Sequence, residues 1–79
     1  MKTTTDILRT AAREFPASML DAEARHIARV RSVSEPAAVR FATLESRIDA
    51  RDGPATAAEL AEIAGLIREI DGPSAVVAR

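Results

Sequence analysis

The chain has 79 residues and a net charge of −1 at pH 7, and its length limits it to one small domain. It contains no cysteine, which excludes a disulfide framework and a thiolate metal site, and it has no apolar run near the roughly 20 residues needed to span a bilayer. Residues 1–6 lack the apolar segment of a secretory signal, so we expect a cytoplasmic protein without membrane contact.

Alanine supplies much of the apolar content. It accounts for 17 residues of the hydrophobic 47% of the chain, and Tyr and Trp are absent. A core with so few bulky side chains is marginal at this length. We therefore expect the domain to gain stability from a partner or from self-association.

The hydrophobic pattern predicts an all-α fold, because period-two alternation is missing and helix signals are frequent. We expect residues 1–79 to form a single compact bundle of four helices joined by short loops. The predicted helices cover residues 5–15, 19–32, 35–52 and 57–71. The apolar tail, residues 73–79, is predicted to be flexible or to dock elsewhere.

Each predicted helix begins at a Ser or Thr that is placed to cap it. The capping-box pairs are Thr3 with Asp6, Ser18 with Asp21, and Thr56 with Glu59, while Ser34 precedes a helix that tolerates Pro36 in its first turn. The tripeptide Asp-Gly-Pro ends both long helices. Its glycines, Gly53 and Gly72, are expected to supply a left-handed residue that closes the last turn.

The predicted helix over 35–52 has a narrow apolar stripe at coiled-coil spacing. The stripe consists of Ala37, Phe41, Leu44 and Ile48. Arg40 and Arg47 flank one edge and Glu45 and Asp52 the other, so the charges permit a self-complementary parallel homodimer. Because two and a half heptads are short for a coiled coil, we favour the interpretation that the stripe is the core face of the bundle.

Two other predicted helices have apolar faces fit for a core. On residues 19–32 this face carries Leu20, Ala24, Ile27 and Val30; on residues 57–71 it carries Leu60, Ile63, Leu66, Ile67 and Ile70. Beside the second face, Ala57, Ala61 and Gly65 form a ridge of small residues. We expect either a neighbouring helix or a partner to pack closely on this ridge, since a glycine inside a helix often marks close approach, and we favour the neighbouring helix.

Residues 56–66 carry a family resemblance. The stretch Thr-Ala-Ala-Glu-Leu-Ala-Glu-Ile-Ala-Gly-Leu resembles the first helix and turn of bacterial helix-turn-helix DNA-binding proteins, in which Ala and Gly recur four apart after a Glu-Leu pair. The resemblance covers 11 of 79 residues and implies a DNA-binding regulator whose recognition helix follows Gly65. The chain departs from that pattern, because the next segment stops at Gly72 and offers Arg68 against Glu69 and Asp71. We carry over no DNA-contacting residue and expect nucleic acid not to be a direct ligand.

The sequence argues against catalysis. It has no Cys or Tyr, and its single histidine, His26, lies beside Arg25 and Arg29 on a polar helix face. The chain has one Glu-x-x-His spacing, Glu23 with His26, whereas a carboxylate-bridged metal bundle needs two, and the three glycines form no phosphate-binding loop. We expect a protein that is not an enzyme and needs no metal or cofactor.

The remaining interpretation is a small helical protein that binds a larger protein or assembly. Antitoxins, adaptors and phage-encoded inhibitors such as anti-CRISPR proteins are analogous in size and chemistry, which makes a bacterial or phage source our expectation. The predicted partner-binding residues are Arg25, Arg29, Arg40, Arg47 and Arg51, because guanidinium groups provide directed donors as well as charge. The alternatives are the DNA-binding regulator and a homodimerisation module.

Overall fold

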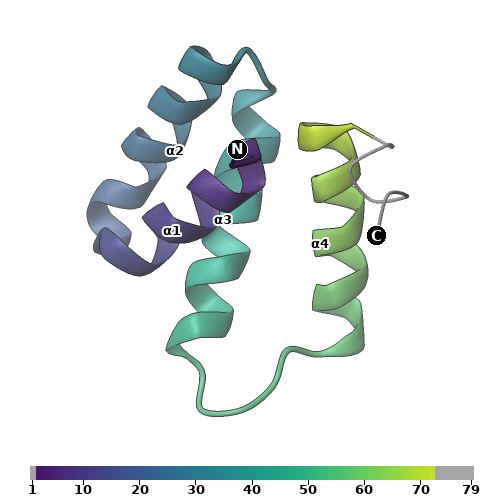
Figure 1. The fold of residues 1–79 in the computed structure, drawn as a ribbon. Helices are drawn as coiled ribbons and strands as arrows, with labels where there is room; N and C mark the ends of the chain where they lie inside the picture. The colour runs from purple at the N-terminus through teal and green to yellow at the C-terminus, as the bar shows by residue number, and fades with distance from the viewer. Residues whose placement is uncertain (1, 73–79) are drawn as a thin grey trace.

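A computed structural model of the chain describes residues 2–72 and confirms the all-α prediction, with four helices and no strand in that range. The helices are α1 (Thr4–Glu14), α2 (Ala17–Arg31), α3 (Glu35–Ala50) and α4 (Ala57–Asp71). α3 is the central helix and contacts the other three, whereas α2 and α4 lie on opposite sides of it and do not touch (Figure 1).

Three of the predicted N-caps are confirmed. The Thr3 hydroxyl accepts the Asp6 amide at 3.1 Å, and the Thr56 hydroxyl accepts the Glu59 amide at the same distance; both boxes are closed by the returning carboxylate. The Ser34 hydroxyl caps α3 through the amide of Ala37, at 3.2 Å. These contacts join residues three apart, so they need only local sequence.

The Ser18 cap is wrong. α2 begins one residue earlier, at Ala17, with Pro16 as its N-cap residue and no capping side chain. Proline fixes its own φ at −66° and holds Phe15 extended, and its carbonyl already accepts the amides of Met19 and Leu20. The first turn is therefore closed by backbone alone, and Ser18 lies within it.

Two helix ends also differ from expectation. α3 ends at Ala50 rather than Asp52, since Arg51 turns to an extended conformation and directs its guanidinium to Glu59 and to the Pro54 carbonyl. Gly72 closes α4 with φ +91°, outside the left-handed helical region. That region is occupied instead by Ser32, which ends α2 at φ 57° and ψ 46°.

Small side chains bring α2 and α3 together, and their contact is the most extensive between any two helices. Four alanines on these helices are completely buried: Ala24, Ala28, Ala38 and Ala42. Phe41, Leu8 and Leu44 provide the largest fully buried apolar side chains of the same cluster. The predicted stripe on α3 is thus the core face of the bundle, and its alanine neighbours allow the close packing.

The packing of Val30, Leu60 and the small-residue ridge was predicted wrongly. Val30 is 68% exposed and Leu60 57% exposed. Ala57, Ala61 and Gly65 face outward, and a Cβ built on Gly65 would meet no atom within 4 Å. The reason is that, within residues 2–72, α4 packs only against α3 and α1, and α1 reaches it near Asp71, so no helix of that range covers the outer face of α4.

Enlarging an alanine at the α2–α3 contact should destabilise the domain. We expect Ala42→Leu to lower the free energy of unfolding by about 1–3 kcal/mol, because the added methyl groups have no space. The matched control Ala61→Leu, on the open face of α4, should change it by less than about 0.5 kcal/mol. Urea unfolding followed by circular dichroism measures both, and equal effects would contradict the close packing of α2 on α3.

Gly65→Ala should stabilise the protein. Gly65 is helical and its surroundings are empty, so alanine gains about 0.5–1 kcal/mol from the lower backbone entropy of the unfolded chain. Thermal unfolding should show a higher midpoint. A lower midpoint would mean that another surface packs on this ridge in solution.

Candidate protein-interaction surface

The predicted arginines on α2 are engaged with acidic side chains of the same chain. Arg25 contacts Asp21 one turn earlier at 2.9 Å and Glu35 at 3.6 Å. Arg29 contacts Glu35 at 3.4 Å, so the two arginines share one carboxylate at the start of α3. The hydrogen bond to Asp21 is the main cause that raises the pKa of Arg25. These pairs tie the C-terminal half of α2 to the first residue of α3.

Two predicted arginines of the α3 segment bind α4. Arg40 forms a bidentate pair with Glu62, in which Nη2 lies 2.9 Å from Oε1. Arg51 forms a second bidentate pair with Glu59. Such fork-to-fork contacts are the strongest geometry for an arginine and a carboxylate. Each pair raises the pKa of its arginine through the hydrogen bonds.

The carboxylates of both pairs respond to these contacts. The pKa of Glu59 falls from its ordinary 4.5 to about 2, first because of the Arg51 hydrogen bond and then because of the backbone amide of Thr56. The pKa of Glu62 is lowered mainly by the hydrogen bond to Arg40. Both groups stay ionised at neutral pH, and both are occupied within the fold.

Arg47 differs from the other four. It is exposed, and among residues 2–72 it forms no ion pair or hydrogen bond, although its charge contributes to the lowered pKa of Glu62. It lies at the edge of a hollow of about 290 Å³ between α2 and α3. The hollow is lined by Ala17, Leu20, Asp21, Thr43, Ser46, Arg47 and Ala50. An uncommitted guanidinium thus stands next to apolar side chains and two hydroxyl groups.

A second hollow region was not predicted. Val30 separates two adjoining depressions of about 500 and 310 Å³, one reaching Ile70 of α4 and the other reaching Ile7 of α1. Arg31 lines both, and its guanidinium donates to the Thr4 hydroxyl at 3.1 Å. The sequence places Val30 on an apolar stripe but gives no sign that the other helices stop short of it.

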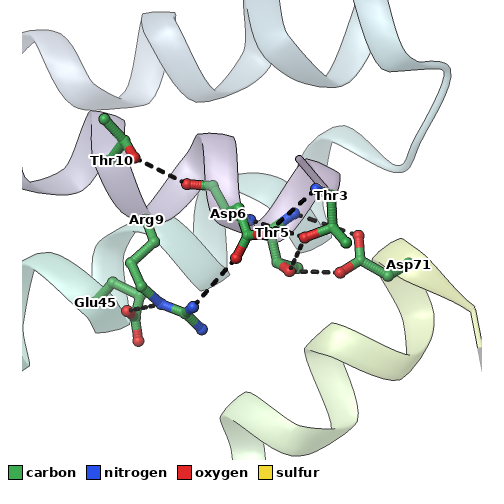
Figure 2. Close-up of polar contacts among 7 residues, drawn as sticks. All are labelled: Thr3, Thr5, Asp6, Arg9, Thr10, Glu45 and Asp71. Carbon is green, nitrogen blue, oxygen red and sulfur yellow. Dashed lines mark hydrogen bonds and ion pairs between the residues drawn. The ribbon is translucent and has the colours of Figure 1, made fainter. Parts of the chain in front are cut away.

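Polar contacts join α1 to the end of α4 where α1 begins (Figure 2). The buried Thr5 hydroxyl donates to the Asp71 carboxylate, which also accepts the Thr5 amide at 3.3 Å. A carboxylate from α4 thereby satisfies a free amide at the N-terminus of α1, where negative charge is favourable. Asp71 had no predicted role, because its partner lies 66 residues away.

Arg9 joins α1 to α3 beside this network. Its Nε lies 2.7 Å from Glu45 (Figure 2). Its guanidinium lies over the Phe41 ring, 5.6 Å from the centroid. Glu45 is therefore paired within the chain, with Arg9, as Arg40 is with Glu62. The homodimer alternative needs both groups, and it also needs an α3 stripe that the structure buries.

The described residues offer no cluster of three His, Asp or Glu side chains suited to a metal ion. Within the same part of the chain, no helix is both long and apolar enough to cross a membrane.

The helix-turn-helix pattern requires a turn at Gly65. α4 instead continues through Gly65 to Asp71, and residues 2–72 contain no further helix after it. The segment therefore lacks, as far as it is described, the recognition helix that reads the major groove in such proteins. The predicted tail over 73–79 lies outside the described residues.

The chain matches no protein-family model, and comparisons with curated proteins and with solved structures likewise return no match.

The Arg51–Glu59 pair predicts a pH dependence. Because the folded pKa of Glu59 lies below 4.5, its ionised form stabilises the fold fully above that pH and loses its contribution as the pH falls toward about 2. Glu59→Gln keeps a capping oxygen but removes the charge, so we expect the variant to be less stable than the natural protein at pH 7. The difference between their free energies of unfolding should narrow between pH 4.5 and 2.

Urea unfolding midpoints across this pH range provide the measurement. Glu69→Gln is the control, since Glu69 is exposed on the same helix and has no ion pair among the described residues. A gap for Glu59→Gln that stays constant down to pH 2 would contradict the stabilising role of the pair.

Proposed function

We propose that the protein is a non-enzymatic binding domain that acts by docking on a larger protein or assembly, in the manner of a bacterial or phage inhibitor, antitoxin or adaptor. The contact is centred on Arg47 and the hollow between α2 and α3. The observation that carries this proposal is that Arg47, unlike the other four predicted arginines, has no ion pair among the described residues and lies beside a partly apolar depression.

The chemistry of the hollow supports a protein partner. Ala17 and Ala50 offer apolar surface beside the buried Leu20, and Thr43 and Ser46 offer hydroxyl groups. Protein interfaces concentrate binding energy where an arginine or aromatic group meets a desolvated pocket surrounded by polar contacts. We expect an acidic side chain of the partner to pair with Arg47 while an apolar neighbour enters the hollow.

The other arginines contribute differently. Arg25, Arg29, Arg40 and Arg51 already hold carboxylates of their own chain. A partner would have to replace these pairs, which costs the bonds already made. Arg47 provides the group that is ready to bind.

Arg47→Glu should abolish partner capture without unfolding the domain. The tagged chain and its variants are incubated with lysate of the source organism, and captured proteins are quantified by mass spectrometry. We expect a protein retained by the natural chain and by Arg13→Glu, an exposed charge reversal on α1, and reduced about tenfold or more by Arg47→Glu. Equal capture by all three forms would refute the assignment of the surface.

The same samples test the alternative functions. The DNA-binding alternative requires salt-dependent affinity for duplex DNA that Arg68→Glu weakens, and fluorescence anisotropy at low salt measures it. We expect flat titrations. Light scattering over a concentration series tests the homodimer alternative, for which the mass would rise toward twice 8.4 kDa.

A further inference from the structure

α4 has the weakest apolar attachment in the domain. Of its 15 residues only Ile63 and Ile70 are buried, whereas α3 buries five. Leu66 and Ile67 are partly covered, and Leu60 is exposed. Among residues 2–72, α4 contacts α3 and α1 on one side, and no other helix lies against its other side (Figure 1). Little hydrophobic free energy is therefore lost when it separates.

Carboxylates of α4 make up the rest of its attachment. Apart from the cap at Thr56, the side-chain hydrogen bonds and ion pairs that join this helix to residues 2–55 involve its carboxylates. The three pairs are Glu59 with Arg51, Glu62 with Arg40, and Asp71 with Thr5. Arg40 and Glu62 are 44% and 41% exposed, so dissolved salt reaches and screens them.

The helix itself does not depend on these partners. Its first turn is capped by Thr56 within the same segment, and its last turn is closed by the amide of Gly72 on the Arg68 carbonyl. The connection from α3, residues 51–56, contains Gly53 at φ +150° and no helix. Movement of α4 needs only changes of dihedral angle in this connection.

From these observations we propose that α4 is a detachable helix. It separates from α1–α3 as a unit before the remaining domain unfolds, and its three carboxylate contacts control how often it does so. Such partial opening is typical of the elements with least apolar burial.

The opening uncovers a charged surface. When α4 leaves, Arg40 and Arg51 lose their carboxylate partners and become available, and the sides of Ile63 and Ile70 that face α3 and α1 are exposed. If the domain binds an acidic protein as proposed above, α4 competes with that partner for the two arginines. This consequence rests on the proposed function, whereas the opening itself does not.

Native-state hydrogen exchange of the full chain, measured by NMR, tests the opening without a partner. We expect amides in the middle of α4, such as that of Ile67, to exchange at least about tenfold faster than those of Phe41 and Leu44 after correction for sequence. Raising the sodium chloride concentration from about 20 to 500 mM should accelerate exchange in α4 more than in α3.

The variant Glu62→Gln separates the carboxylate contact from general destabilisation. It should speed exchange about two- to fivefold throughout α4 and leave α2 and α3 nearly unchanged, while Glu69→Gln should have little effect on any helix. If α4 and α3 instead exchange at equal corrected rates with equal salt response, the two open together and the proposal is overturned. The salt series on the natural protein decides the matter even if the variant unfolds.

Discussion

The close approach of α2 to α3 is the contact on which the rest of the fold depends. Alanines of both helices contribute to it, among them Ala28, Ala38 and Ala42, which lie completely buried beside larger side chains such as Ile27 and Phe41. Alanine permits short interhelical distances, so a chain with few bulky residues still reaches dense packing. The arrangement makes α3 the central helix, covers Phe41 on all sides, and leaves α4 to attach on the face turned away from α2 (Figure 1).

The two attachments to α3 differ in their physical basis. α2 is joined to it mainly by apolar burial, with the pairs of Arg25 and Arg29 to Glu35 at one end, whereas α4 has two buried side chains and depends on Glu59, Glu62 and Asp71. The same ion pairs decide the chemistry of the surface. Arg25, Arg40 and Arg51, which the sequence predicts as partner-binding residues, form ion pairs within the chain. Arg47 remains outside these pairs.

The sequence predicts a feature well when the residues that produce it are close together in the chain. The boxes at Thr3 and Thr56 were predicted because a hydroxyl and an amide three residues apart suffice. The predicted capping box at Ser18 is wrong because the helix begins earlier, after Pro16. This effect of proline is also local, and here it prevails over the capping-box pattern. Leu60 and Gly65 were misplaced because periodicity shows that a face is apolar without showing whether another helix lies against it.

The sequence by itself therefore determined the all-α class, four helices with their approximate limits, and three of their N-terminal caps, since these depend on hydrogen bonds between near neighbours. Tertiary structure decided which apolar faces are covered, that Asp71 closes the start of α1, and which arginines are already paired. Those outcomes join residues from 6 to 66 positions apart. Their partners are fixed only when the helices pack, because burial and ion pairing depend on what lies opposite in space.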